Sequence, residues 1–380
     1  MPVISKISAR PITDSRNKET IEVSVVTKSG HVGVAGVPSG TSTGSFEAAV
    51  LPVDQSIRII EELLSPKLTG LPIDDQRAID KKLISLDGTE RKERLGGNTL
   101  IGVSMAVTRA AAQEAGQPLY RYLSALSGST PALPTPLCVV ICGGKHGKSS
   151  RLSFQEFLVG GPLEAARQIY DALGQKLPPD TGLEGAFAPD LSNLEALGLV
   201  TQTIESLGFA PDGEVTLGID FAATTLDRPP EVSELVEMAT NYPVSLMEDP
   251  LPEEAWHLWA QLKLELKAVD ESILMVGDDL FVTNHTRLEK GISELIANAI
   301  LIKPNQVGTV TETLDVIRLA RKAGFTHIVS HRSGETMDDF IADLAVGTGA
   351  KFLKAGSPSA DFPERAVKYA RLAEIAKEIA

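Results

Sequence analysis

The C-terminal half of the chain repeats one pattern, a short apolar strand that ends in an ionisable side chain and is followed by a helical segment. The six strand segments read E-V-T-L-G-I-D, P-V-S-L-M-E-D, I-L-M-V-G-D-D, A-I-L-I-K, H-I-V-S-H and K-F-L-K, and their polar ends are Asp220, Glu248, Asp278, Lys303, His331 and Lys354. Successive ends are 28, 30, 25, 28 and 23 residues apart. Each interval is the length of one β/α unit, so we expect parallel units that place all six polar ends on one face.

Two further strands precede these units and complete a barrel. L-C-V-V-I-C (137–142) and S-F-Q-E-F-L-V (153–159) are separated by only 10 residues, too few for a crossover helix, so we expect this pair to be antiparallel. Helices are predicted near 163–175 and 192–207. The predicted fold class is therefore α/β, a closed eight-stranded β/α barrel of irregular order ββαα(βα)6, whose ring is closed by a last helix from Glu364 to Ile379.

The first third of the chain has a different pattern and is predicted to form a small separate domain. S-K-I-S-A-R-P-I-T, T-I-E-V-S-V-V-T and H-V-G-V-A-G-V each alternate apolar and polar residues, which predicts a meander of three strands. Helical patterns follow, including an alanine-rich one from Asn98 to Gly116, and then S-G-S-T-P-A-L-P-T-P breaks all periodicity. We therefore expect an N-terminal α+β domain at 1–126, a linker at 127–136 and the barrel at 137–380.

Composition excludes several classes of partner. The 380 residues carry a net charge of −14, which argues against nucleic acid and anionic membranes but not against a small anionic substrate held by a local positive cluster. No run of 18 apolar residues is present, so no membrane span is expected, and the N-terminus lacks the apolar core of a signal peptide. The two cysteines, Cys138 and Cys142, are expected to be reduced thiols in a cytoplasmic protein.

The polar strand ends, taken in order, describe a site that abstracts a proton. Asp220, Glu248 and Asp278 would repel one another on one barrel face unless a cation lay among them. Hard oxygen ligands without cysteine favour Mg²⁺ over zinc. A lysine near that cation and near a second lysine, as expected for Lys303 and Lys354, has its ammonium form disfavoured and can act as a base. Such a site can remove a proton α to a carboxylate and stabilise the resulting dianion on metal.

Residues outside the strand ends carry less specific signals. Arg332 and Ser333 follow the fifth strand end directly and could hold a phosphate or a carboxylate. Ser39 alone could sit in a simple turn, and His146 in G-G-K-H-G-K could be an ordinary loop histidine. A glutamate inside an apolar strand, as predicted for Glu156, is costly unless it is paired, which favours a role in a site.

Long segments spread over the whole chain resemble the enolase family. These segments are D-S-R (14–16), V-P-S-G-T-S-T-G (37–44), L-D-G-T-E (86–90), Q-E-F (155–157), E-G-A-F-A-P (184–189), M-E-D-P (247–250), G-D-D-L-F-V-T-N (277–284), L-I-K-P-N-Q-V-G (301–308), V-S-H-R-S-G-E-T (329–336) and L-K-A-G (353–356). The resemblance implies Mg²⁺-dependent, reversible dehydration of 2-phosphoglycerate to phosphoenolpyruvate, a step of glycolysis and gluconeogenesis. It further implies a carbon–oxygen lyase that works in the cytoplasm as a homodimer or larger homo-oligomer.

The resemblance also implies a role for each matching residue. Lys303 is implied as the base that removes the C2 proton, with Lys354 as its partner on the substrate carboxylate. Glu184 is implied as the acid that assists departure of the C3 hydroxyl, with Glu156 as its neighbour in that step. Two Mg²⁺ ions are implied, the second arriving with the substrate. The other implied groups are the tighter metal site (Asp220, Glu248 and Asp278), the second metal (Ser39, in a lid loop at 37–44 with glycines at its ends), the substrate pocket (His146, Gln155 and His331, the last also counted as catalytic) and the phosphate site (Arg332 and Ser333).

The chain departs from the family pattern close to several of these residues. The departures are Leu183 in place of an aspartate before Glu184, Ala186 in place of a glycine, Cys142 and Lys145 in place of an asparagine and a serine in the histidine loop, N-K-E (17–19) in place of G-N-P, P-E-R (363–365) in place of R-S-E-R, and a shortened segment between Glu156 and Glu184. They leave two alternatives open. One is an enolase-like lyase acting on a related phospho- or phosphono-carboxylate, and the other is a binding protein that has kept the fold and lost turnover. Retention of both lysines, both glutamates and all three metal carboxylates argues against the second.

Overall fold

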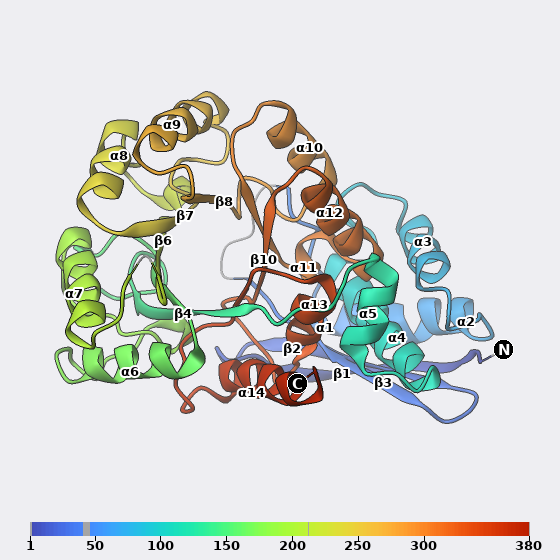
Figure 1. The fold of residues 1–380 in the computed structure, drawn as a ribbon. Helices are drawn as coiled ribbons and strands as arrows, with labels where there is room; N and C mark the ends of the chain where they lie inside the picture. Colours follow the sequence, from blue (N-terminus) through green and yellow to red (C-terminus); the bar gives the residue numbers. More distant parts are fainter. Residues whose placement is uncertain (1, 41–45, 212, 380) are drawn as a thin grey trace.

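The predicted barrel is present. The structure, a computed structural model, describes residues 2–40, 46–211 and 213–379. Among these residues, eight strands close into a barrel in the order β10-β11-β4-β5-β6-β7-β8-β9 (Figure 1). The strands are β4 (Thr135–Cys142), β5 (Glu156–Gly160), β6 (Thr216–Asp220), β7 (Val244–Glu248), β8 (Leu274–Gly277), β9 (Ala299–Ile302), β10 (Thr326–Ser330) and β11 (Phe352–Lys354). The α/β fold class and its irregular order are confirmed.

β5 is the irregular member of the barrel, because it runs antiparallel to both of its neighbours. Its first residue, Glu156, therefore lies opposite the last residues of β4 and β6, Cys142 and Asp220. The prediction of a strand from residue 153 was wrong, since β5 begins at Glu156. The amide oxygen of Asn193 accepts the backbone N–H groups of Ser153 and Phe154, so these two residues are bonded to the first residue of α7 (Asn193–Ser206) instead of to a strand.

Helices surround the barrel in the order that the sequence predicts. They are α6 (Leu163–Gly174), α7 (Asn193–Ser206), α8 (Val232–Asn241), α9 (Trp256–Val269), α10 (His285–Ser293), α11 (Pro304–Val307), α12 (Val310–Lys322), α13 (Phe340–Thr348) and α14 (Pro363–Ile379), with short 3₁₀ turns η2 (Leu183–Gly185) and η3 (Ala223–Thr225). Apolar strand residues such as Leu158, Leu246 and Leu301 fill the barrel interior. A larger apolar core lies between the strands and the helices.

The N-terminal part is a three-stranded antiparallel meander covered by helices, among the residues that the structure describes. Its elements are β1 (Ile4–Thr13), β2 (Glu19–Thr27), β3 (Val32–Gly36), α1 (Val53–Arg58), the π-helical stretch η1 (Ile59–Leu64), α2 (Ser65–Leu68), α3 (Gln76–Asp87), α4 (Gly97–Glu114) and α5 (Leu119–Ser127). The alanine-rich α4 packs on β2 and β3. A side chain at Gly33 would come within 2.0 Å of the Ala106 carbonyl oxygen, so the close approach of strand and helix requires glycine there.

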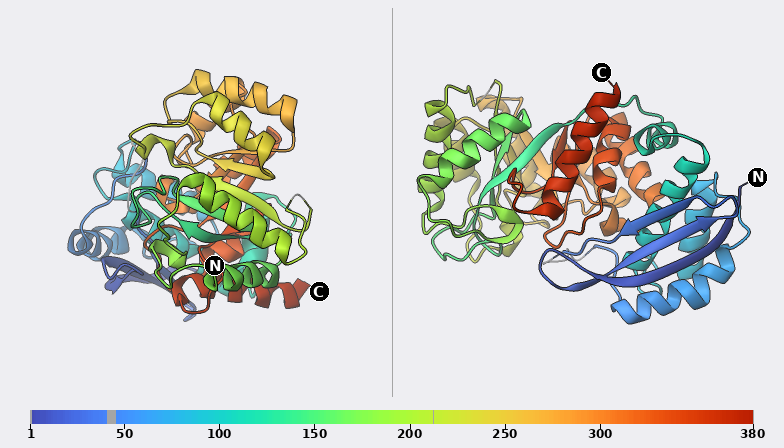
Figure 2. Two further views of the ribbon diagram at one scale, coloured as in Figure 1. Left: turned by 90° about the vertical axis from the view of Figure 1, so that its left-hand side faces the viewer. Right: turned by 90° about the horizontal axis from the view of Figure 1, so that it is seen from below.

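The N-terminal part lies beside the barrel and is joined to it by helix packing. Figure 2 (right) shows the sheet next to the barrel, with α14 running along the barrel wall. α3, α4 and α5 contact α12, and α5 also packs on α13. α5 ends at Ser127 and β4 begins at Thr135; we propose that the domain boundary falls between them.

Both cysteines are free and buried. Within the described ranges, the chain contains no helix with the length and apolar character needed to cross a membrane.

Candidate active site

A polar pocket opens at the end of the barrel where the parallel strands terminate. Of the six strand-end residues, all but Glu248 line it, and Glu248 is fully buried beneath the Lys354 ammonium group. The predicted residues from outside these strand ends that also line it are His146, Gln155, Glu156, Glu184, Arg332 and Ser333. Ser39 is absent from the lining formed by the described residues, although its neighbour Gly40 belongs to it. The structure therefore brings most of the predicted site residues together.

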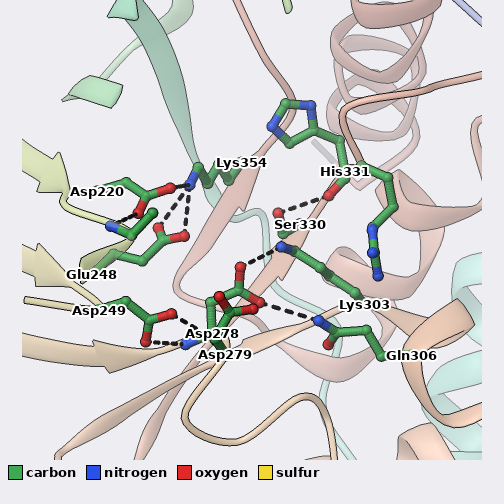
Figure 3. A network of polar contacts seen from close by, with 12 residues as sticks. Asp220, Glu248, Asp249, Asp278, Asp279, Lys303, Gln306, Ser330, His331 and Lys354 are labelled. Carbon is green, nitrogen blue, oxygen red and sulfur yellow. Dashed lines mark hydrogen bonds and ion pairs between the residues drawn. The ribbon is translucent and has the colours of Figure 1, made fainter. Parts of the chain in front are cut away.

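Lys354 forms the centre of one carboxylate cluster (Figure 3). Its Nζ lies 2.7 and 2.8 Å from the two oxygens of Glu248 and 3.4 Å from Asp220 Oδ2. It also lies 2.8 Å from Glu156 Oε2 on the antiparallel strand. Burial lowers the pKa of Lys354, but these carboxylates outweigh burial and hold the pKa well above its ordinary value. Burial and nearby carboxylates in turn raise the pKa of Glu248 well above its usual range, so the cluster is crowded with negative charge.

Lys303 and Asp278 form a second cluster in the same pocket (Figure 3). Lys303 Nζ donates directly to Asp278 Oδ2, and the amide of Gln306 donates to the other Asp278 oxygen at 3.2 Å. Burial lowers the pKa of Lys303, but the adjacent Asp278 outweighs it, and the pKa lies above its ordinary value. The expected lowering of this pKa depends on a cation close to Lys303, and the direct contact with Asp278 acts in the opposite direction.

Sequence reasoning missed two acidic residues next to the predicted ligands. Asp249 accepts the backbone N–H groups of Asp278 and Asp279 at 3.0 and 2.7 Å. Oxygens of these three aspartates lie within 4.8 Å of one another. Asp249 also has a left-handed backbone with φ of 40°, a conformation that costs energy outside glycine. M-E-D and G-D-D carry both residues in the sequence, but only the fold shows that Asp249 holds the Asp278 loop in place.

His146 and Glu184, in the loops after β4 and α6, form a group of acid–base residues with Glu156 and His331. His146 Nδ1 lies 3.0 Å from Glu156 Oε1 and 3.7 Å from Glu184 Oε1. His331 Nε2 lies 3.2 Å from Glu184 Oε2. Burial lowers the pKa of His146, but Glu184 and Glu156 raise it above its ordinary value. Burial raises the pKa of Glu184, but His146 and Arg365 outweigh burial and the pKa lies below its ordinary value.

Glu184 is held in an unusual backbone conformation. Its φ is 69°, in the left-handed region that non-glycine residues rarely adopt. Its carbonyl accepts the backbone N–H of Ser357 at 3.0 Å, and its side chain is buried. Strain of this kind persists only where the surrounding structure over-determines it, and it is frequent at functional sites.

Most departures from the enolase pattern lie in the two segments that contain His146 and Glu184. The thiol of Cys142 donates towards the carbonyl oxygens of His146 and Ala186, at 3.5 and 3.6 Å. The backbone N–H of the half-buried Leu183 donates to the His146 carbonyl at 3.0 Å. Burial and the neighbouring Glu156 and Glu184 raise the pKa of Cys142, so it acts as a neutral packing residue. Lys145 is exposed. The substitutions thus change the residues that support Glu184 and His146 and leave the six ionisable strand-end residues unchanged.

Arg332 is already engaged in a buried ion pair. Its guanidinium donates to both oxygens of Glu47, at 2.9 and 3.3 Å, and to Asn305 Oδ1 at 3.2 Å. Glu47 is 4% exposed and lines the pocket. It was missed because a single glutamate in G-S-F-E-A-A has no periodicity that points to a site. The Ser333 hydroxyl accepts a hydrogen bond from Arg16 Nη1 at 3.4 Å. An anion bound by Arg332 and Ser333 would therefore lie beside Glu47 and Arg16.

Ser39 belongs to a polar contact between the N-terminal part and the barrel. Its hydroxyl donates to Asp14 Oδ2 at 2.9 Å and accepts from Arg16 Nη2 at 2.6 Å. Its backbone pairs with Gly334 in both directions. Of the predicted lid at 37–44, residues 41–44 lie outside the described part of the chain. Gln155 Nε2 donates to Asp220 Oδ2 at 3.2 Å, beside the first carboxylate cluster.

Comparison with known proteins agrees with this geometry. The model of the enolase N-terminal domain matches residues 4–123, and that of the enolase C-terminal TIM barrel domain matches 130–229 and 229–380. Curated proteins named enolase from Acidothermus cellulolyticus and Natranaerobius thermophilus are each 42% identical to this chain, and one from Mycobacterium leprae is 41% identical. These matches cover 100% of this chain and 95%, 96% and 95% of the relatives, respectively. The chain therefore belongs to the enolase family of carbon–oxygen lyases.

Proposed function

We propose that the protein catalyses the Mg²⁺-dependent, reversible dehydration of 2-phosphoglycerate to phosphoenolpyruvate. The observation that supports this most strongly is that one pocket holds two lysines in contact with carboxylates together with Glu184 and its two histidines. A β-elimination from a carboxylic acid needs a base at C2, positive charge at the carboxylate and an acid at C3. The pocket offers candidates for all three.

The residues present fit a hard divalent cation. Asp220, Glu248 and Asp278 offer oxygen donors at the ends of three adjacent strands, and these are the ligands that Mg²⁺ takes. Lys354 and Lys303 now neutralise part of their charge, yet the pKa of Glu248 stays well above its ordinary value because burial and Asp220 both raise it. When bound, Mg²⁺ would supply the positive charge that stabilises the dianion of the substrate carboxylate. We keep Ser39 as the proposed ligand of a second ion that arrives with substrate.

Lys303 is proposed as the base and Lys354 as its partner. In the forward direction the C2–H bond breaks, the proton goes to Lys303 Nζ, and the electron pair moves into the carboxylate. Lys354 lies between Glu156 and the Glu248 carboxylate, where its ammonium group can hold a substrate carboxylate oxygen. The role of Lys303 requires that its contact with Asp278 be loosened, because that contact keeps the amine protonated.

Glu184 is proposed as the acid of the second step. The electron pair at C2 forms the C2–C3 double bond, the C3–O bond breaks, and the hydroxyl leaves as water with a proton from Glu184. The pKa of Glu184 lies below its ordinary value, so the carboxyl group must take up its proton when the substrate binds. Glu156 and His146 lie within reach of that exchange, at 3.0 Å from each other.

The substrate's phosphate is proposed to lie against Arg332 and Ser333, where Glu47 and Arg16 already contact them. A second candidate function is favoured by the substitutions around Glu184, namely elimination from a related phospho- or phosphono-carboxylate. Cys142 and Leu183 both contact the His146 carbonyl, so they bear on the shape of the pocket near C3. We further propose that the substrate is a small phosphorylated acid. The protein is proposed to work in the cytoplasm as a homodimer or larger homo-oligomer.

An assay of the purified protein with 2-phosphoglycerate tests the function directly. We expect ultraviolet absorbance of the enol product to rise with Mg²⁺, and turnover to stop when a chelator removes the metal. Mg²⁺ at about 100 times its Kd should raise the free energy of unfolding by about 2.7 kcal/mol, a Tm increase of about 3–5 °C for a chain of this size. Asp278→Asn should lose most of that increase, while the matched control Asp315→Asn, at a surface ion pair with Arg77, should keep it. No turnover of 2-phosphoglycerate alongside turnover of a phosphonate analogue would favour the second candidate.

A further inference from the structure

Arg365 is a buried arginine that reaches the active site from the last helix. It lies in the first turns of α14 and is 2% exposed. Its guanidinium donates to the carbonyl oxygens of Arg332 and Ser333, at 2.6 and 2.7 Å, and its Nη1 lies 2.6 Å from His331 Nδ1. Gly356 makes room for it, since a side chain at that position would come within 2.7 Å of the Arg365 Cδ atom. Arg365 is not among the described residues that line the pocket, so it acts through His331.

The contact between Arg365 and His331 has only one chemically reasonable direction. A guanidinium carries N–H donors, has no acceptor and stays protonated in proteins. The Nδ1 atom of His331 must therefore accept, and it carries no proton. The proton of a neutral imidazole is then on Nε2. That atom lies 3.2 Å from Glu184 Oε2, an oxygen for which the described part of the chain supplies no well-aligned hydrogen bond.

We propose that Arg365 is a positioning residue that holds His331 as the neutral tautomer with its proton on Nε2, the ring nitrogen that lies next to the Glu184 carboxyl group. His331 can then act as a donor to Glu184 or to the leaving hydroxyl, and it cannot accept a proton at Nδ1. The tautomer follows from contacts alone. Its importance for catalysis rests on the proposed function, in which Glu184 serves the second step.

The surroundings of the ring agree with this assignment. Burial lowers the pKa of His331, and Arg365 and Lys354 lower it further, while Glu156 and Glu335 raise it. The pKa lies well below its ordinary value, so the ring is neutral at pH 7. Glu184 is buried together with the ring, each side chain being 3% exposed, and burial strengthens the electrostatic effect of one fixed donor on a carboxylate.

Nitrogen NMR of the wild-type protein tests the tautomer without any activity measurement. The chain has six histidines, and comparison with His331→Gln identifies the signals of His331. We expect the ¹⁵N shifts of a neutral ring with an unprotonated Nδ1 and a protonated Nε2. A protonated Nδ1 in the wild type would overturn the proposal, whether or not the protein turns over 2-phosphoglycerate.

Two variants and a matched control separate positioning from stability. Arg365→Met removes the donor and should release the tautomer, giving a mixed or Nδ1-protonated ring. Arg365→Lys keeps a cation with donors only and should restore the Nε2–H form. Lys368→Met removes another buried cation of α14, one that is 1% exposed and pairs with Glu335 at 2.8 Å. It should lower stability and leave the His331 signals unchanged.

Activity supplies the second readout. We expect Arg365→Met to lower kcat about 10- to 100-fold, the scale of one hydrogen bond to a charged group, with KM within about twofold. Lys368→Met should retain kcat within about threefold. An unchanged His331 tautomer in folded Arg365→Met, or the same tautomer change in Lys368→Met, would overturn the inference even if the wild type is fully active. An inactive wild type with the expected tautomer would instead contradict the proposed function alone.

Discussion

The pocket has two sides that are built in different ways. One side consists of the ends of the regular parallel strands, where Asp220 and Lys354 are the last residues of their strands. The other side consists of loops around the antiparallel start of the barrel, where His146 and Glu184 lie. Strand ends are held by the ladder hydrogen bonds of the barrel itself. The loops are held by a few single contacts, such as Cys142 to the His146 carbonyl at 3.5 Å.

This difference explains where the chain has diverged. The ionisable strand-end residues match the enolase pattern, whereas Leu183 and Ala186 lie on the loop side, and Cys142, the last residue of β4, contacts the His146 carbonyl of that side. A substitution at a barrel strand end moves a group that the whole sheet positions, while loop contacts can be replaced one at a time. In the proposed function, proton abstraction at C2 belongs to the strand-end side and hydroxyl departure at C3 to the loop side. The two steps should therefore respond to different substitutions.

Lys303→Ala is expected to have the largest effect, because it removes the proposed base on which both steps depend. Net turnover and exchange of the C2 proton with solvent should both fall by about 10³-fold or more, near the upper part of the range for losing a positioned base. Proton exchange by NMR in heavy water and the absorbance assay measure the two rates. The exposed Lys322→Ala, at the end of α12, serves as the control. Exchange at the wild-type rate in Lys303→Ala would show that another residue is the base.

Glu184→Gln should separate the two sides. It keeps the size of the side chain but removes the proposed proton donor, so dehydration should fall by about 10²-fold or more. Exchange at C2 should stay within about threefold, since Lys303 and the carboxylates lie on other elements. Exposed Glu237→Gln on α8 should change neither rate. If exchange falls as far as dehydration, the two sides of the pocket do not divide the chemistry between them.

Leu183→Asp is the smallest and most specific test, because it restores the carboxylate found in the family. A negative neighbour raises the pKa of Glu184, whereas loss of an apolar neighbour that excludes water lowers it, so the direction depends on which effect is larger. We expect the dehydration rate to change by more than about threefold, a barrier change of somewhat under about 1 kcal/mol. C2 exchange should stay within about twofold. Should both rates shift together, or neither move, Leu183 is not what distinguishes this chain from its relatives.

The order of elements and the strand-end residues could be predicted from the sequence. Each strand is an apolar run closed by a polar residue, and in parallel β/α units such ends must share one face. The three carboxylates and two lysines are therefore visible as a spacing pattern. The loop residues lack such a pattern, and His146 and Glu184 were identified through their resemblance to a family. β5 begins later than predicted because the backbone N–H groups of Ser153 and Phe154 donate to the Asn193 side chain, about 40 residues away, instead of to a neighbouring strand.

The contacts that tune the site could be seen only in three dimensions. Arg365 meets His331 across 34 residues of chain, and Arg332 meets Glu47 across 285. Neither pair has a periodicity or a local motif, because each is made when two segments that are distant in sequence pack on the same barrel end. The pKa of Lys303 shows the same limit, because the sequence does not reveal the direct contact with Asp278 that raises it. Local patterns decide which residues reach the pocket, and packing between distant segments decides their partners and protonation.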